Sequence, residues 1–233
     1  MVEKQVEKKR GFQELPPNEK TQICRNIRYY VRLDKKSDET TPVTWSPDNP
    51  FGIFSGGYTK NRRMRGRETN PGYNELHGVD FRGVTRGLMQ RFPGETISVL
   101  DIGCGAGIFG MELQMEMNSD GKQNVKARGT NIRVEKSAIP TDVMIGENLK
   151  YNDNSFHLVV TTYAATKYTG RLDLVLEEMY RVTKPGGEVH FQGESEIMSK
   201  EAIQKAMHEF EQKHNIKIQE KQDGLEAYWF KKP

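Results

Sequence analysis

The chain has 233 residues, 35% of them hydrophobic and 29% charged, which is typical of a folded protein with a polar surface. No apolar run approaches the roughly 18–20 residues of a membrane span, and the charged residues 1–10 are unlike a secretory signal. Cys24 and Cys104 are too few for a disulfide framework or a paired metal-ligand spacing. We therefore expect a cytoplasmic protein without a metal site, although export without an N-terminal signal stays open.

The net charge of +3 is too small to indicate nucleic acid by itself, but it is unevenly distributed. Residues 1–70 contain 15 Lys and Arg against 9 Asp and Glu, whereas the rest of the chain contains 20 against 23. This local excess is densest at five residues: Lys60, Arg62, Arg63, Arg65 and Arg67. The cluster is either a solvated loop or an arm that meets a phosphate-bearing or acidic substrate.

Residues 1–72 are predicted to form an extension that covers a substrate or docks it. Its apolar spacing predicts a helix from Asn18 to Leu33. Residues 34–70 are rich in Pro, Gly, Ser, Thr and Asn, which indicates a long loop. The aromatic residues of that loop shape either a substrate pocket or the small core of a lid: Trp45, Phe51, Phe54 and Tyr58.

From residue 73 onwards helical and strand patterns alternate, so residues 73–233 are predicted to form one domain. A helix is predicted from Tyr73 to Phe92, where Pro93-Gly94 ends it. The elements predicted after it are strand Ile97–Ile102, helix Ile108–Met117, strands Val125–Ile132, Val143–Ile145 and Phe156–Thr162, helix Leu172–Val182, strand Glu188–Gln192 and helix Lys200–His214.

The last segment is predicted to be an antiparallel hairpin, with Ile216–Lys221 and Leu225–Lys231 joined across Asp223-Gly224. The alternation before it predicts a parallel sheet with helices on both faces. The predicted fold class is therefore α/β, with an antiparallel edge on a mostly parallel sheet.

A glycine-rich turn follows the first predicted strand, in the stretch Val99-Leu100-Asp101-Ile102-Gly103-Cys104-Gly105-Ala106-Gly107. Glycines let a ligand approach the backbone closely, and open α/β sheets bind ligands at the carboxyl ends of their strands. Asp101 stands two residues before the first glycine. A carboxylate at this place attracts a sulfonium cofactor with a free amino group and repels a pyrophosphate.

The stretch from Gly105 to Gly110 also satisfies the dinucleotide fingerprint G-x-G-x-x-G, which is a weak signal on its own. A dinucleotide site would need an Asp or Glu about 20 residues further on. The chain has Gly129-Thr130-Asn131-Ile132-Arg133 there, with no acid. Together with Asp101, this disfavours a dinucleotide.

Three ordered segments resemble the class I S-adenosylmethionine-dependent methyltransferases of the methyltransferase-domain type, from about residue 73 to the C-terminus. Val99–Gly107 resembles the first motif of that family, Asn148–Val160 resembles its "NLPFPDNSFDLVV" stretch, and Arg181–Gly187 resembles "RVLKPGG". The resemblance implies a Rossmann-like seven-stranded mixed sheet of order 3-2-1-4-5-7-6, with strand 7 antiparallel. It also implies S-adenosylmethionine as the cofactor and in-line methyl transfer as the activity.

The same resemblance implies which residues bind the cofactor. Its methionine part would be surrounded by the residues of the glycine turn, Asp101, Gly103, Cys104 and Gly105, and its ribose and adenine would meet Asn131 and Ile132 after the second strand. The adenine edge would meet Glu147, Asn148 and Leu149 before the fourth strand. The methyl-transfer site would lie at the end of that strand, beside Thr161 and Thr162.

The chain departs from the family pattern at three places. Asn131 stands where the family usually has an acid that binds the ribose hydroxyls, so cofactor affinity is lower or Glu135 helps. The loop before Asn148 is shorter than is typical of the family, so the resemblance gives less support to a contact between Glu147 and the adenine. His157 replaces the usual Asp and is expected to be structural or at the surface.

No general base is assigned by the sequence, and one is needed only where the acceptor must lose a proton. The candidates are His77, Asp80, Tyr163 and Tyr168, each of which also has a structural alternative. His77, Tyr163 and Tyr168 are also the candidates for substrate contact. No Asn/Asp-Pro-Pro-Tyr signature follows the fourth strand, which by resemblance disfavours amino-methylation of nucleic-acid bases.

We expect a small-molecule methyltransferase whose N-terminal extension closes over the site. One alternative is an RNA or protein methyltransferase that docks its substrate through the basic cluster. The other is a non-catalytic binding module, which only Asn131 favours. The sequence does not indicate an oligomeric state.

Overall fold

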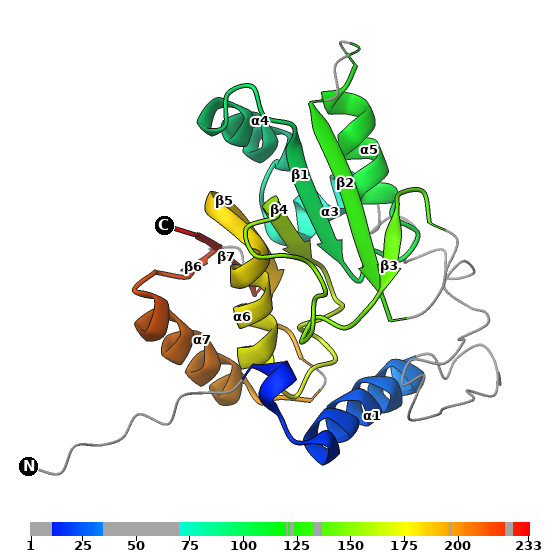
Figure 1. The fold of residues 1–233 in the computed structure, drawn as a ribbon, viewed down its shortest axis with the longest axis vertical. Helices are drawn as coiled ribbons and strands as arrows, with labels where there is room; N and C mark the ends of the chain where they lie inside the picture. Colours follow the sequence, from blue (N-terminus) through cyan, green and yellow to red (C-terminus); the bar gives the residue numbers. More distant parts are fainter. Residues whose placement is uncertain are drawn as a thin grey trace, which may run out of the picture.

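A computed structural model describes residues 11–34, 70–119, 121, 124–132, 137–195, 197–221 and 226–233. Within these residues seven strands form one sheet in the order β3-β2-β1-β4-β5-β7-β6, which confirms the predicted order and the Rossmann-like α/β class (Figure 1). The strands are β1 Ile97–Ile102, β2 Val125–Asn131, β3 Thr141–Val143, β4 Phe156–Thr161, β5 Thr183–Gln192, β6 Gln219–Glu220 and β7 Ala227–Lys231. The first five run parallel, and β7 pairs antiparallel with both β5 and β6, as predicted.

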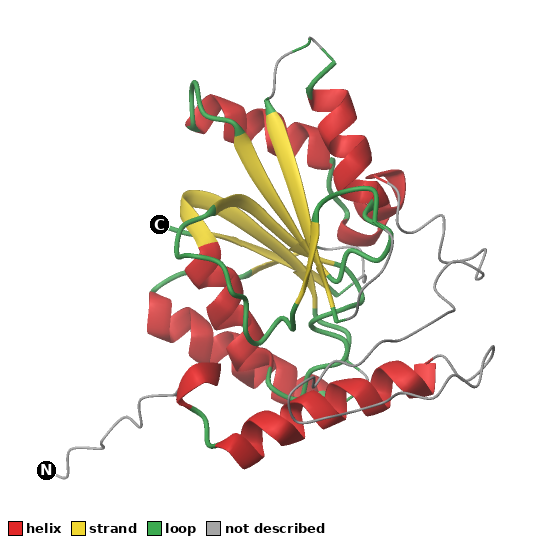
Figure 2. Ribbon diagram, turned by 45° about the vertical axis from the view of Figure 1, so that its right-hand side comes forward, coloured by secondary structure: helices red, strands yellow, loops and turns green. Residues whose placement is uncertain are grey.

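Helices cover both faces of the sheet, which buries the central strands β1 and β4 on both sides (Figure 2). One core lies between the sheet and α4 and α5, and includes Val99 and Val160. The other lies between the sheet and α6 and α7, and includes Leu100 and Val159. The helices are η1 Phe12–Glu14, a short 3-10 helix, then α1 Pro17–Asp34, α3 Asn70–His77, α4 Phe81–Arg91, α5 Ile108–Met117, α6 Leu172–Val182 and α7 Lys200–His214.

The single helix predicted from Tyr73 to Phe92 is wrong, because α3 and α4 are separate helices. Gly78 adopts a left-handed φ of 59° after α3, a conformation that glycine tolerates. Asp80 then acts as the N-cap of α4 and accepts a hydrogen bond from the backbone N–H of Arg82. Asp80, one of the candidate bases, is thus a capping residue.

Three strands differ most from the prediction, and one of them, β6, covers Gln219–Glu220 instead of Ile216–Lys221. β3 ends at Val143 instead of beginning there, and Ile145 makes only an isolated bridge with Asn148. β5 begins at Thr183, not at Glu188, because Thr183 already pairs with Phe156 of β4. The Lys-Pro-Gly-Gly stretch then shifts the register before Glu188 pairs with Leu158. The predicted loop over residues 34–70 lies outside the described residues, apart from Asp34 and Asn70, as does the Asp223-Gly224 turn.

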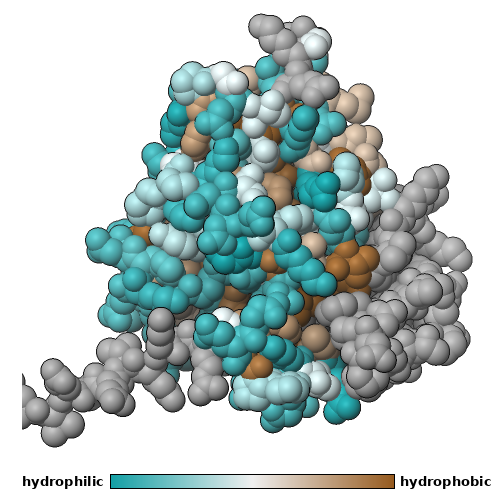
Figure 3. Space-filling model, in the orientation of Figure 1, coloured by the Kyte–Doolittle hydropathy of each residue, from teal (hydrophilic) through white to brown (hydrophobic). Residues whose placement is uncertain are grey.

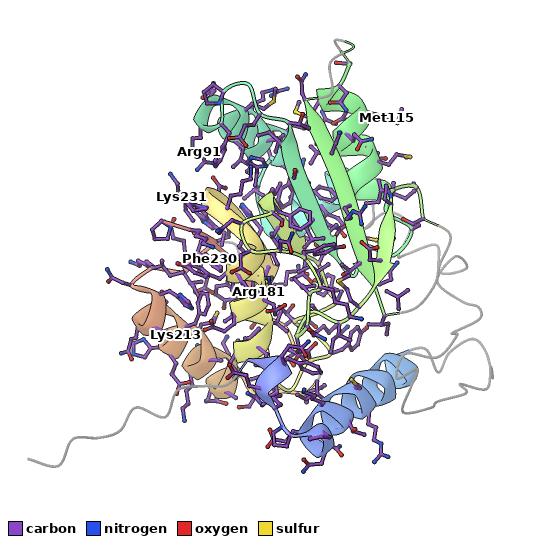
Figure 4. All side chains as sticks on the ribbon, in the orientation of Figure 1. Arg91, Met115, Arg181, Lys213, Phe230 and Lys231 are labelled. Carbon is purple, nitrogen blue, oxygen red and sulfur yellow. The ribbon has the colours of Figure 1, made fainter. Side chains whose placement is uncertain are left out.

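The described surface is mainly hydrophilic in the view of Figure 3, with apolar atoms gathered toward its right-hand side. Two large apolar side chains are exposed in the described residues: Met115 and Val143. Met115 projects outward from α5 (Figure 4). Among the described residues no helix has the length and apolar character needed to cross a bilayer, and no group of three or more metal-ligand side chains gathers.

Candidate cofactor site at the carboxyl edge of the sheet

The glycine turn after β1 adopts a backbone that only glycine accommodates easily. Gly103, Gly105 and Gly107 have φ values of 77°, 55° and 71°. A Cβ on Gly103 would lie 2.1 Å from the Cβ of Ala164, and one on Gly107 would lie 2.4 Å from Ser137 Oγ. The turn therefore packs closely against the loop that follows β4 at Gly103, and against the segment before β3 at Gly107.

Asp101 is a buried carboxylate at the base of this turn, with 1% of its surface exposed. The hydroxyl of Tyr73 in α3 donates to both carboxylate oxygens, at 3.1 and 3.0 Å. Burial and the nearby Asp101 raise the pKa of Tyr73, so its hydroxyl remains a donor. The Tyr73 ring stacks on Phe109, with ring centroids 4.1 Å apart. Sequence reasoning missed Tyr73, since no motif marks it.

Asn131 lies at the end of β2 beside the same turn. Its Oδ1 accepts from the backbone N–H of Gly105 at 3.0 Å, and its Nδ2 donates to the Gly105 carbonyl at 2.9 Å. The predicted contact of Asn131 with a ribose is not tested by this arrangement and stays a prediction. Ile132, the next residue, packs on an apolar cluster formed with the N-terminal segment.

β4 ends at Thr161 and is followed by Thr162, and the two threonines contact different partners. Thr161 Oγ1 donates to the carbonyl of Ile102 at 3.0 Å, which joins β4 to β1. Thr162 Oγ1 lies 2.7 Å from Nε2 of His77 in α3. The Thr162 hydroxyl also bonds the Tyr73 hydroxyl and tends to lower the pKa of that phenol. His77, Thr162, Tyr73 and Asp101 are thus connected at the carboxyl ends of β1 and β4.

His77 is an uncharged buried histidine. Burial, and then the nearby His190, lower the pKa of His77 to about 3. Its Nδ1 is buried without a hydrogen-bond partner. A side chain with this pKa is a weak proton acceptor at neutral pH, so its contact with Thr162 is a hydrogen bond between neutral groups.

Tyr163 begins the loop after β4 in a left-handed conformation, with a φ of 48°. Non-glycine residues adopt this region rarely, and such strain gathers at functional sites. The side chain of Gln192 at the end of β5 supports it, since Oε1 accepts from the Tyr163 N–H at 3.1 Å and Nε2 donates to the Leu76 carbonyl at 3.2 Å. Gln192 is a second residue that sequence reasoning missed.

Glu147 is fully buried before β4, and its Oε1 accepts from the Thr169 hydroxyl at 2.6 Å. Burial is the largest cause that raises the pKa of Glu147, to about 7. Its neighbour Asn148 accepts a hydrogen bond from Gln13 at 2.6 Å. Leu149 is buried in the core beneath α6 and α7.

The N-terminal segment packs against this edge of the sheet. In Figures 1 and 2, α1 lies across the side toward which the parallel strands point. One apolar cluster joins the two parts: Leu15, Ile23 and Cys24 of the N-terminal segment with Ile145, Tyr168 and Leu174, and with Phe12 and Ile132 partly buried against them. Tyr168 therefore packs within this cluster.

Other motif residues hold the fold together. Arg181 donates to the carbonyls of Leu149 and Tyr151 at 2.6 and 2.7 Å, and so joins α6 to the segment before β4 (Figure 4). His157, at the start of β4, is buried and accepts from the N–H of Ser98 at 2.9 Å, which confirms the expected structural role. The basic cluster, the loop aromatics and Glu135 lie outside the described residues.

The described residues fit a ligand that carries a positive amino group and that approaches the backbone of the glycine turn closely. Asp101 supplies a buried negative charge at the turn, where a phosphate would be repelled. The three left-handed glycines add no side chains of their own, and Ala164 and Ser137 pack against two of them. This combination is compatible with the predicted cofactor site, and the individual cofactor contacts stay a prediction.

Comparisons with known proteins give a family match over part of the chain and structural matches of low identity. Residues 100–191 match the family described as a methyltransferase domain. The solved PH0226 protein of Pyrococcus horikoshii is 16% identical, with 76% of this chain and 100% of that chain covered at a TM-score of 0.46. A TehB-like SAM-dependent methyltransferase of Corynebacterium glutamicum is 16% identical, with 75% and 97% covered at a TM-score of 0.45. No curated protein matches this sequence.

Residues 100–191 of the chain therefore match the methyltransferase-domain family, on a sheet of the order that the resemblance implied. The chain is an enzyme of this type with S-adenosylmethionine as its cofactor, as the sequence predicted.

Proposed function

We propose that this enzyme methylates a small-molecule acceptor in the cytoplasm, with residues 1–72 as a lid over the domain of residues 73–233. The observation that carries the proposal is the packing of η1 and α1 on the carboxyl edge of the sheet, through Leu15, Ile23 and Cys24. A covered edge favours an acceptor that can be enclosed over one that needs an open groove.

In this proposal the cofactor supplies an activated methyl group, and the protein supplies position and charge. Asp101 binds the amino group of the methionine part, with Tyr73 holding the carboxylate in place through its hydroxyl. The glycine turn and the residues after β2 and before β4 bind the rest: Gly103, Cys104, Gly105, Ile132, Glu147, Asn148 and Leu149. Orientation alone lowers such a barrier by several kcal/mol, about 7–11 at best.

The acceptor approaches the end of β4 in this proposal. Thr161 fixes the strand end to β1, and Thr162 presents its hydroxyl beside His77. Tyr163 opens the loop that borders the acceptor, supported from beneath by Gln192. His77 serves to orient Thr162, because its low pKa makes it a poor base.

The test is transfer of a labelled methyl group from S-adenosylmethionine to three fractions of a cell extract: low-molecular-mass metabolites, RNA and protein. We expect label in the metabolite fraction with the wild-type protein and none with Asp101→Asn. Label in RNA would favour the basic cluster as a docking arm, and salt-dependent RNA binding would support that outcome. Label in protein would also overturn the small-molecule proposal. Binding of the demethylated cofactor without transfer to any fraction would indicate a binding module.

A truncation tests the lid. Removal of residues 1–34 should raise the KM for the acceptor and weaken cofactor affinity, because Ile132 and Ile145 lose their apolar cover. Unchanged kinetics in a folded truncated protein would contradict the lid.

A further inference from the structure

The side chain of Asn131 continues the pairing of β2 with the chain that follows β1. The strand register ends at Ile102 opposite Thr130. The N–H groups of Gly103 and Cys104 then both donate to the Thr130 carbonyl, at 2.8 and 3.0 Å. One step further, the Asn131 amide takes both hydrogen-bonding groups of Gly105. The amide thus replaces the backbone partner that a longer strand would provide.

This pair of hydrogen bonds requires an amide. Gly105 presents one donor, its N–H, and one acceptor, its carbonyl. An amide side chain matches them with one acceptor, its oxygen, and one donor, its nitrogen. The opposite orientation of the amide would set like groups against each other. A carboxylate could accept from the Gly105 N–H, but its second oxygen would face the Gly105 carbonyl. Both residues are buried, so an unpaired or repelled group there is costly.

Together with the neighbouring contacts, the hydrogen bonds between Asn131 and Gly105 hold the glycine turn against β2. The Cys104 side chain packs on Gly129, where an added Cβ would lie 2.2 Å from its Sγ. Gly105 comes next in the chain and has a left-handed φ of 55°. Its conformation is therefore determined from β2, through the side chain of Asn131.

We propose that Asn131 is a positioning residue that holds the glycine turn in its cofactor-binding shape, and that it does not recognise the ribose. This inference rests on the proposed cofactor site at the same turn. It predicts that Asn131→Asp weakens cofactor binding. A ribose contact predicts the opposite, because a carboxylate bonds a hydroxyl more strongly than an amide does.

The chain contains a matched control at the other end of β2. Asn118 Nδ2 donates to the Val125 carbonyl at 3.0 Å, and its Oδ1 accepts from the Val125 N–H at 2.9 Å. The change Asn118→Asp therefore breaks the same kind of amide pair, but on the side of the strand away from the glycine turn. This variant therefore measures how the loss of such a pair affects stability while the glycine turn stays unchanged.

The experiment is calorimetry with two probes, S-adenosylhomocysteine and its 2′-deoxy analogue, on the wild type and both variants. We expect Asn131→Asp to weaken both probes by the same factor, about tenfold or more, and Asn118→Asp to leave both affinities unchanged. Asn131→Ala, which adds no charge, should weaken both equally but less, and replaces the Asp variant if that one does not fold.

Three results of this calorimetry would overturn the inference. The first is tighter or unchanged binding of S-adenosylhomocysteine by Asn131→Asp. The second is an effect of that variant confined to the probe with the 2′-hydroxyl, because such coupling locates the contact at the ribose. Equal weakening by Asn118→Asp would also overturn it, since the loss would then follow stability.

Hydrogen exchange separates this inference from the proposed function. Without any ligand, the Gly105 amide should be protected in the wild type and should exchange at least about tenfold faster in Asn131→Asp. An unprotected Gly105 amide would refute the amide pair even in a protein that binds the cofactor. A protected amide in a wild type that binds neither probe would refute the cofactor site and leave the amide pair intact.

Discussion

The two ends of the parallel strands differ in how their buried polar groups are satisfied. At the amino end His157 accepts from Ser98, and its other ring nitrogen lies 3.2 Å from Glu95, which also pairs with Lys184. At the carboxyl end His77 keeps one buried nitrogen without a partner, and Glu147 carries a carboxyl whose pKa burial raises.

The difference separates fold-holding residues from site residues. A fully paired histidine such as His157 stabilises the strand that it begins, although it lies within a family motif. Unpaired and strained groups cost stability and are retained where a ligand can use them. The carboxyl edge is therefore the place where substitutions should change binding, and the amino edge where they should change stability.

The largest expected effect is on cofactor affinity in Asp101→Asn. Loss of a buried charge partner should weaken S-adenosylhomocysteine by more than about a hundredfold, measured by calorimetry. Asp142→Asn is the control, because Asp142 pairs with Arg128 where both side chains are partly exposed, and it should leave affinity unchanged. Tight binding by Asp101→Asn would show that the carboxylate does not meet the cofactor.

Glu147→Gln should stabilise the protein at pH 8. The folded state holds the Glu147 proton more tightly, since its pKa is about 7 instead of 4.5. As pH rises from 4.5 to about 7, the unfolded chain loses this proton first and the free energy of unfolding falls, by up to about 3 kcal/mol. Denaturant unfolding should therefore show a gain for Glu147→Gln at pH 8 and little change at pH 4.5.

Replacement of Glu188 should change the free energy of unfolding at pH 8 in the opposite direction. Burial alone would raise its pKa, but hydrogen bonds from His190 and Arg91 outweigh that and lower it. Its stabilising contribution is present above its ordinary pKa and is lost as the pH falls through the lowered value. Glu188→Gln should thus destabilise at pH 8. A gain in both variants would remove the distinction between the two buried glutamates.

A smaller effect is expected for His77. Loss of its hydrogen bond to Thr162 in His77→Ala should lower label transfer to the active fraction about tenfold. His77→Gln, which keeps a donor, should retain most activity. The pH profile should keep its shape in both, because His77 is uncharged above about pH 3. Loss of an acidic limb in either variant would identify His77 as a general base.

The smallest effect is expected far from both strand ends. Lys213, which Figure 4 labels on α7, pairs with Glu177 in α6 at 2.8 Å, with both side chains partly exposed. Lys213→Ala should change the free energy of unfolding by less than about 1 kcal/mol and leave cofactor affinity unchanged. A larger change would mean that surface pairs contribute as much as the buried groups of the strand ends.

Sequence reasoning found the elements that local patterns specify. Ile97–Ile102, Ile108–Met117, Leu172–Val182 and Lys200–His214 have the predicted bounds. It failed at Gly78, where the apolar spacing continues across a left-handed glycine and a new cap. It also failed at β3, whose three residues carry too little pattern to fix their position.

The candidate site divides in the same way. Asp101 and the glycines were predicted because strand, acid and glycine turn are contiguous in the chain. Tyr73 and Gln192 were not, since each meets the site only through α3 or the end of β5. The partner of Asn131 could not be predicted either, because Gly105 lies 26 residues away and the choice of an amide is decided by their contact in space.

The sequence by itself determined the class of the protein, because the glycine turn and the two later motifs are local signals that survive without coordinates. Only the tertiary structure decided which polar groups pair. It joined Asn131 to Gly105, Tyr73 to Asp101 and His77 to Thr162. The physical reason is that burial and hydrogen-bond satisfaction are properties of neighbours in space, which the order of residues along the chain does not specify.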